Sequence, residues 1–102
     1  MEPAETGDKI MTDPRIARAE QIAKALTGYR TEDVGRGCWV YDAKVWAKGS
    51  KVRVYLDKRY VDREGNIEAR VFGGGNIDLI PGGIVYAIKD DANAIRRAVE
   101  AI

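Results

Sequence analysis

The sequence predicts an α+β fold, with an N-terminal helix, an antiparallel meander of four or five strands and a C-terminal helix, and with both helices packed on one sheet face. Apolar residues recur every three or four positions near both ends of the chain, as in amphipathic helices. Between them, short runs alternate between apolar and polar residues and are separated by turn-forming residues, as in strands. A chain of 102 residues is long enough for one hydrophobic core.

The N-terminal segment divides into a tail and a helix. Residues 1–12 contain few apolar side chains and are expected to be disordered, which leaves residues 13–102 as a single domain. Asp13 and Pro14 provide a helix N-cap and a first-turn proline, and Gly28 is a suitable end. The apolar stripe expected between them consists of Ile16, Ala19, Ile22, Ala23 and Leu26.

A β-hairpin is expected after a loop over residues 30–37. Residues 38–48 and 51–60 both alternate between apolar and polar side chains, and Gly49 and Ser50 between them suit a two-residue type II′ turn. Because facing residues of an antiparallel pair share a face of the sheet, counting outward from this turn sets the register. The expected pairs are Lys48 with Lys51, Ala47 with Val52, Trp46 with Arg53, Val45 with Val54, Lys44 with Tyr55 and Ala43 with Leu56. This register brings the apolar residues of both strands onto one face, which supports it independently.

The rest of the sheet is expected to consist of shorter strands. These strands cover residues 67–72, 77–80 and 84–89, with turns or breaks at 62–66, 73–76 and 81–83. The glycine-rich segment from Val71 to Gly83 matches neither common phosphate-binding motif and does not open a helix. We therefore interpret its glycines as turns and bulges.

A second helix is expected at the C-terminus. Asp90 and Asp91 place negative charge at its N-terminal end, where the helix dipole favours it. Its apolar stripe consists of Ile95, Ala98, Val99 and Ile102, at positions i, i+3, i+4 and i+7. Since each helix has a single apolar stripe, the simplest arrangement packs both on one face of the sheet and leaves the other face open.

The composition argues against an enzyme and against a membrane protein. No histidine is present, Ser50 is the only serine and Cys38 is the only cysteine, so the common Ser-His, Cys-His and histidine-metal arrangements cannot form. We expect no catalytic activity and no cofactor, and we interpret Cys38 as a small buried hydrophobic residue. No apolar run approaches the roughly 20 residues of a membrane span, and no signal-peptide pattern is present, so we expect a cytoplasmic protein.

Positive charge is concentrated in the predicted hairpin, although the formal net charge of the whole chain is only +1. Residues 38–63 contain seven Lys or Arg and three Asp, a difference of +4. Trp46 and Arg53 face each other in the predicted register, which suits a cation–π pair worth about 0.5–1 kcal/mol at an exposed site. The outer face of the hairpin carries Lys44, Trp46, Lys48, Lys51, Arg53 and Tyr55, and we expect Arg70 and Phe72 to extend it.

Interleaved cations and aromatic rings are typical of surfaces that bind single-stranded nucleic acid, because the cations neutralise phosphates and the rings stack on bases. We therefore expect a binding domain without chemistry of its own, whose partner is nucleic acid, single-stranded rather than duplex, or a nucleoprotein.

Alternatives to a nucleic-acid partner stay open at this point. The same Trp, Tyr and Arg side chains suit a protein partner, for example if the chain is a small inhibitor or adaptor that a phage or mobile element uses against a bacterial defence system. A merely solvated sheet face also carries Lys and Arg. A homodimer is compatible with the two edges and the open face of the sheet.

Overall fold

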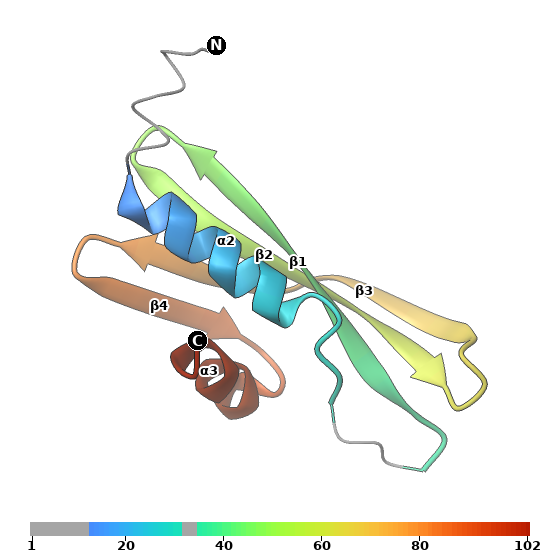
Figure 1. Cartoon of the computed structure of the whole chain (residues 1–102). Helices are drawn as coiled ribbons and strands as arrows, with labels where there is room; N and C mark the ends of the chain where they lie inside the picture. The colour runs from blue at the N-terminus through green and yellow to red at the C-terminus, as the bar shows by residue number, and fades with distance from the viewer. Residues whose placement is uncertain (1–12, 32–34) are drawn as a thin grey trace.

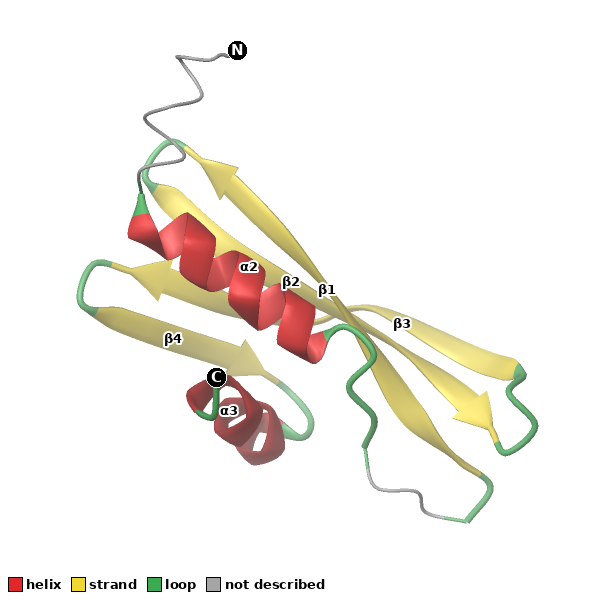
Figure 2. Cartoon of the chain, viewed as in Figure 1, coloured by secondary structure: helices red, strands yellow, loops and turns green. Residues whose placement is uncertain are grey.

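A computed structural model of the chain describes residues 13–31 and 35–102, and the tail predicted over residues 1–12 lies outside the described residues. The predicted α+β fold is confirmed. Its elements are α2 (Pro14–Leu26), β1 (Gly37–Lys48), β2 (Lys51–Asp62), β3 (Ile67–Ile80), β4 (Gly83–Ile88) and α3 (Ala92–Glu100). The four strands form one antiparallel sheet in the order β1-β2-β3-β4, and α2 lies across one face of it (Figures 1 and 2).

Helix α2 begins and ends where the sequence predicts. The Asp13 carboxylate accepts a hydrogen bond from the backbone N–H of Arg15 at 2.9 Å, and Pro14 occupies the first turn. At the other end, Gly28 adopts a φ of 86°, which a residue with a side chain rarely takes. Ala19, Ile22 and Leu26, all expected in the apolar stripe, are fully buried.

The Asp13 cap makes a testable contribution to acid stability. Hydrogen bonds from the Arg15 side chain and then from its backbone hold the pKa of Asp13 below its ordinary value of 3.8. Since the pKa is lower in the folded state, this stabilisation is present above about pH 4 and is lost as the pH falls through the folded-state pKa. We expect Asp13→Asn, which keeps a capping oxygen but does not titrate, to make the free energy of unfolding less dependent on pH in this acid range. Urea denaturation at several pH values checks this, and an unchanged dependence would contradict it.

The hairpin of β1 and β2 has the predicted register. All six expected pairs occur, from Lys48 with Lys51 to Ala43 with Leu56. Gly49 has a φ of 60°, whereas Asp91 is the only non-glycine residue with positive φ among those described, so Ser50 has negative φ. These signs fit the type II′ turn and exclude type I′, which needs positive φ at both positions.

Strand β3 is one long strand, not the two that we predicted, so the sheet has four strands and not five. Leu56 pairs with Gly75 and Lys58 pairs with Val71, which leaves three residues of β3 opposite Asp57 alone. These three form a β-bulge, in which Gly73 has a φ of 72° and its N–H donates to the Asp57 carboxylate at 2.8 Å. The interpretation of these glycines as bulge residues is therefore confirmed, but they do not end the strand.

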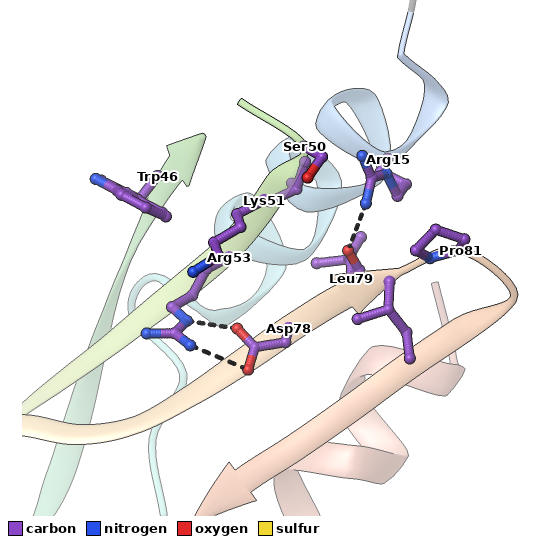
Figure 3. A pocket seen from close by; sticks show the side chains of 10 residues that line it. Arg15, Trp46, Ser50, Lys51, Arg53, Asp78, Leu79 and Pro81 are labelled. Atoms are coloured by element: carbon purple, nitrogen blue, oxygen red, sulfur yellow. Dashed lines mark hydrogen bonds and ion pairs between the residues drawn. The ribbon is translucent and has the colours of Figure 1, made fainter. Parts of the chain in front are cut away.

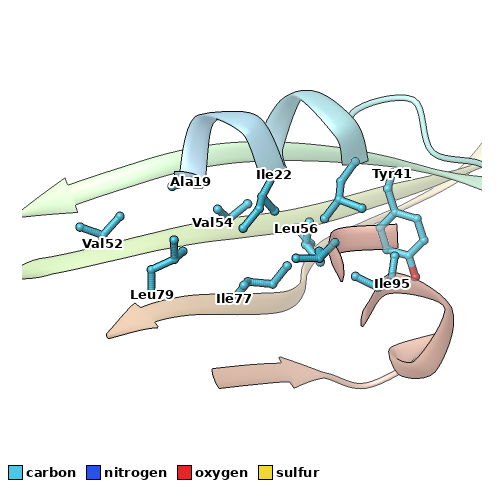
Figure 4. Packing of buried hydrophobic residues seen from close by; sticks show 11 residues of the cluster. Ala19, Ile22, Tyr41, Val52, Val54, Leu56, Ile77, Leu79 and Ile95 are labelled. Carbon is cyan, nitrogen blue, oxygen red and sulfur yellow. The ribbon is translucent and has the colours of Figure 1, made fainter. Parts of the chain in front are cut away.

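The core lies between the sheet and the two helices, which both pack on the same face (Figure 4). Alternate residues of the central strands point into it, as expected of a sheet with one buried face. The largest fully buried side chains are Tyr41, Ile22, Leu26, Leu56, Ile77, Ile95, Val54 and Val99. Among the described residues, no helix is long and apolar enough to span a membrane.

Helix α3 is tied to the sheet through the two acidic residues that precede it. Asp91 makes no side-chain cap, and its carboxylate instead accepts a hydrogen bond from the Tyr41 hydroxyl at 3.0 Å. Burial, together with this bond, raises the pKa of Tyr41. Asp90 forms an ion pair of 3.1 Å with Lys58, whose Nζ also lies 4.6 Å from the centre of the Trp39 ring. Ile102, expected in the apolar stripe, lies beyond the end of α3 and is exposed.

The ends of β1, β2 and β3 that are distant from the Gly49 turn project beyond the helices (Figure 1). Cys38 and Val40 of β1 and Val61 of β2 form a small second cluster there. Cys38 is 4% exposed, so its expected burial is confirmed. Neighbouring aromatic rings of Trp39 and Tyr60 meet edge-on at 5.3 Å.

Candidate functional site

The face of the sheet opposite the helices is called the open face below. Its residues alternate along each strand with those of the core, so pairing and alternation assign its members. From the level of Asp42 and Arg59 to the Gly49 turn, they are Asp42, Lys44, Trp46 and Lys48 from β1, Lys51, Arg53, Tyr55, Asp57 and Arg59 from β2, Arg70, Phe72, Asn76, Asp78 and Ile80 from β3, and Val85 and Ala87 from β4. Beyond that level the same side of the sheet carries Cys38, Val40 and Val61, which are buried. The open face thus contains all eight residues that the sequence singled out.

Near the Gly49 turn, the open face borders a hollow of about 320 Å³. Trp46 and Lys51 lie on one side of it and Pro81 on the other (Figure 3). Ile80 also lines it. Arg15, from the first turn of α2, reaches the rim, where it donates to the backbone oxygen of Leu79 at 3.1 Å and pairs with Asp13. The hollow therefore combines an aromatic wall with cationic groups.

Arg53 is engaged within the protein. Its Nε donates to one Asp78 carboxylate oxygen, and its Nη2 lies 3.3 Å from the other (Figure 3). Asp78 faces Arg53 directly in the β2–β3 register. These bonds, with one to the Tyr55 hydroxyl, raise the pKa of Arg53 further. The positive charge of Arg53 is therefore neutralised by Asp78 within the protein.

The prediction of a cation–π pair between Trp46 and Arg53 is wrong, because Arg53 lies near a different aromatic ring. The two residues do face each other, but the Arg53 guanidinium lies 5.4 Å from the centre of the Tyr55 ring. Tyr55 also meets Trp46 edge-on, with ring centres 6.3 Å apart. Arg53 thus contacts Asp78 and Tyr55, and Trp46 is 37% exposed on the open face.

A second hollow, of about 270 Å³, lies between the middle of β1 and the bulge of β3. Lys44, Arg70 and Phe72 contribute to its lining, together with Asp42 and Arg59, which form an ion pair of 2.6 Å. Phe72 precedes Gly73 in the bulge and is 76% exposed, the most exposed large apolar side chain among the described residues. The bulge that Asp57 anchors thus presents an aromatic ring to solvent.

The charge of the open face is positive after its internal ion pairs are counted. From the level of Arg59 and Arg70 to the Gly49 turn, it has six cations, Lys44, Lys48, Lys51, Arg53, Arg59 and Arg70, against three anions, Asp42, Asp57 and Asp78, a difference of +3. Two arginines are paired with aspartates. Four cations remain that make no ion pair with any described residue: Lys44, Lys48, Lys51 and Arg70. All four are exposed.

Sequence reasoning missed the carboxylates that neutralise the arginines. Asp78 was assigned to a separate short strand, so its position opposite Arg53 could not be derived. Asp42 and Arg59 both lie on the predicted hairpin and point to the same face. Arg59 is two residues from Asp57, which faces Asp42, so the two side chains are diagonal neighbours and their pairing was a usable signal.

Comparisons with protein-family models, with curated proteins and with solved structures found no match. In the part of the chain that the structure describes, no cluster of His, Cys, Asp or Glu is arranged to hold a metal ion. The fold and the site define an α+β domain with a four-stranded antiparallel sheet and a basic, aromatic open face.

Proposed function

We propose that the chain binds single-stranded nucleic acid on its open face. The observation that carries this proposal is the grouping of four cations without ion-pair partners in the described structure around two exposed rings, Trp46 and Phe72. The cations supply phosphate contacts that release counterions, and each ring supplies a stacking platform for a base.

Single-stranded nucleic acid suits this face better than a duplex. Stacking on Trp46 and Phe72 needs bases that are not already paired and stacked, and a broad sheet face receives splayed bases as other single-strand-binding sheets do. Helix α3, which follows Asp90 and Asp91, offers no basic N-terminus for a duplex backbone. The proposed role is binding alone, without a chemical step.

A fluorescence-anisotropy titration with single-stranded oligonucleotides of DNA and of RNA tests the proposal. If all four cations contact phosphates, log K should fall with log salt at a slope of about −2.8, which is four contacts at about −0.7 each. We expect Trp46→Ala with Phe72→Ala to weaken binding about 30-fold or more, because stacking contributes about 1–3 kcal/mol per base. The ring-preserving pair Trp46→Phe with Phe72→Tyr is the matched control and should retain most of the affinity.

Absent binding at about 50 mM salt, or binding that does not respond to salt, would overturn the proposal. In that event a protein partner on the same face gains support, because Trp46 and the 46% exposed Ile80 border one hollow and suit interface anchors. A pull-down from nuclease-treated bacterial lysate separates the two outcomes, since only a protein partner survives digestion.

A further inference from the structure

Strand β4 forms an open edge of the sheet. It pairs with β3 over residues 75–80 without a bulge, and no described residue outside β3 is hydrogen-bonded to the backbone or side chains of residues 83–88. Its sequence, GIVYAI, contains no charged residue and no proline. Charges, prolines and bulges are the features by which edge strands ordinarily avoid pairing with another strand. Strand β4 lacks all three.

The other edge of the sheet is protected. The segment after α2 runs along β1, with hydrogen bonds from Gly28 N–H to the Tyr41 oxygen, from Tyr41 N–H to the Tyr29 oxygen and from Thr31 N–H to the Trp39 oxygen, at 2.7, 2.9 and 2.9 Å. The remainder of β1 carries Asp42, Lys44 and Lys48. An incoming strand would meet satisfied hydrogen-bonding groups or charges at this edge, so β4 is the edge available for pairing.

We propose that β4 pairs in antiparallel orientation with β4 of a second copy of this chain. The occupant is a second copy because an uncharged strand meets no like charge when it faces itself, and because a two-fold axis makes the backbone hydrogen bonds of the two edges mutually complementary. Two four-stranded sheets then form one continuous sheet of eight strands.

The register of such a pair is restricted by the faces of β4. Val85 points to the open face, whereas Ile84, Tyr86 and Ile88 are partly buried against the core. Facing residues of an antiparallel pair lie on the same face, so the apolar faces match only in a register that places Val85 opposite Val85 or shifts it by two residues. In either register the two open faces lie on the same side of the sheet. The dimer thus presents one continuous basic and aromatic surface.

The side chains of β4 point to the two faces of the sheet and not along its edge. Val85 is 47% exposed on the open face. On the helix side, the Arg96 guanidinium of α3 lies 5.0 Å from the centre of the Tyr86 ring. A ladder of about five residues per strand is a small interface, so we expect reversible association in the micromolar range or weaker.

Sedimentation equilibrium of the full chain without nucleic acid, from about 10 μM to about 1 mM, tests this proposal independently of the proposed function. We expect a monomer–dimer equilibrium, and we expect Val85→Lys or Val85→Glu to weaken it about tenfold or more, because like charges then meet across the new ladder. An equimolar mixture of the two variants should restore dimers, since opposite charges then face each other. Ile67→Lys places the same charge at an exposed apolar residue at the far end of β3 and should leave association unchanged.

A monomer at every concentration would overturn the proposal. A dimer that Val85→Lys leaves unchanged would overturn it as well, since the interface would then lie elsewhere. The mixture of the two Val85 variants gives a further test. If each variant alone is monomeric and their mixture stays monomeric, the introduced Lys and Glu side chains do not meet across β4 and the proposal fails.

Discussion

Replacing Leu56 with alanine is expected to lower the free energy of unfolding by about 2–5 kcal/mol. Leu56 is fully buried in the middle of β2, within the cluster that joins the sheet to both helices. It pairs with Gly75 of β3, which has no side chain that could move into the space left by the leucine. The cavity should therefore persist, and the cost should fall in the upper part of this range. Urea denaturation followed by circular dichroism measures it.

Ile80→Ala is the matched control for this prediction. Ile80 is also an apolar residue of a central strand, but its side chain is 46% exposed on the open face. Less apolar area is lost there, and we expect a change below about 1 kcal/mol. Similar costs for the two variants would show that the core is not centred on Leu56.

Reversing the two lysines that flank the Gly49 turn is expected to have the largest effect on nucleic-acid binding. Lys48 and Lys51 face each other, are exposed and make no ion pair with a described residue. In Lys48→Glu with Lys51→Glu, the loss of two phosphate contacts should reduce the salt slope by about 1.4, at about 0.7 per contact. The new negative charges should weaken binding further at low salt. Anisotropy titrations at several salt concentrations measure both quantities.

A control variant with the same change in net charge distinguishes direct phosphate contacts by Lys48 and Lys51 from general attraction of nucleic acid to a positively charged protein. Lys24→Glu with Arg97→Glu reverses two exposed cations on α2 and α3, on the side of the molecule opposite the open face. We expect this pair to leave the salt slope near that of the unmodified chain. An equal loss of affinity in both double variants would show that binding depends on the overall charge of the protein and not on contacts at the open face.

The hairpin was predictable because its information is local. The Gly49 turn and the alternation on either side of it determine the register, and a slip by one residue would turn every apolar side chain of one strand to the solvent. The same local rules located helix α2, since Asp13, Pro14 and Gly28 are end signals that act within one turn. Phe72 and Arg70 were placed correctly on the open face for a similar reason, by alternation along β3.

The bulge in β3 could not be derived from local pattern. Three consecutive glycines, Gly73 to Gly75, interrupt the alternation and are typical of the end of a strand. Nevertheless, Val71 before them and Gly75, the last of them, both pair with β2. Pairing across the sheet compensates for the low strand propensity of glycine, and the Asp57 carboxylate satisfies the N–H of Gly73. Both contributions come from residues about 16 positions away along the chain.

The sequence alone determined that the open face would be rich in cations and aromatic rings, because alternation in strands decides which residues share a face. Only the tertiary structure decided which of those charges remain available. Arg53 and Arg59 are engaged by Asp78 and Asp42, whereas Lys44, Lys48, Lys51 and Arg70 have no such partner in the described structure. The physical reason is that Coulombic and hydrogen-bonding interactions depend on distance in space, and Arg53 and Asp78 are 25 residues apart in the chain.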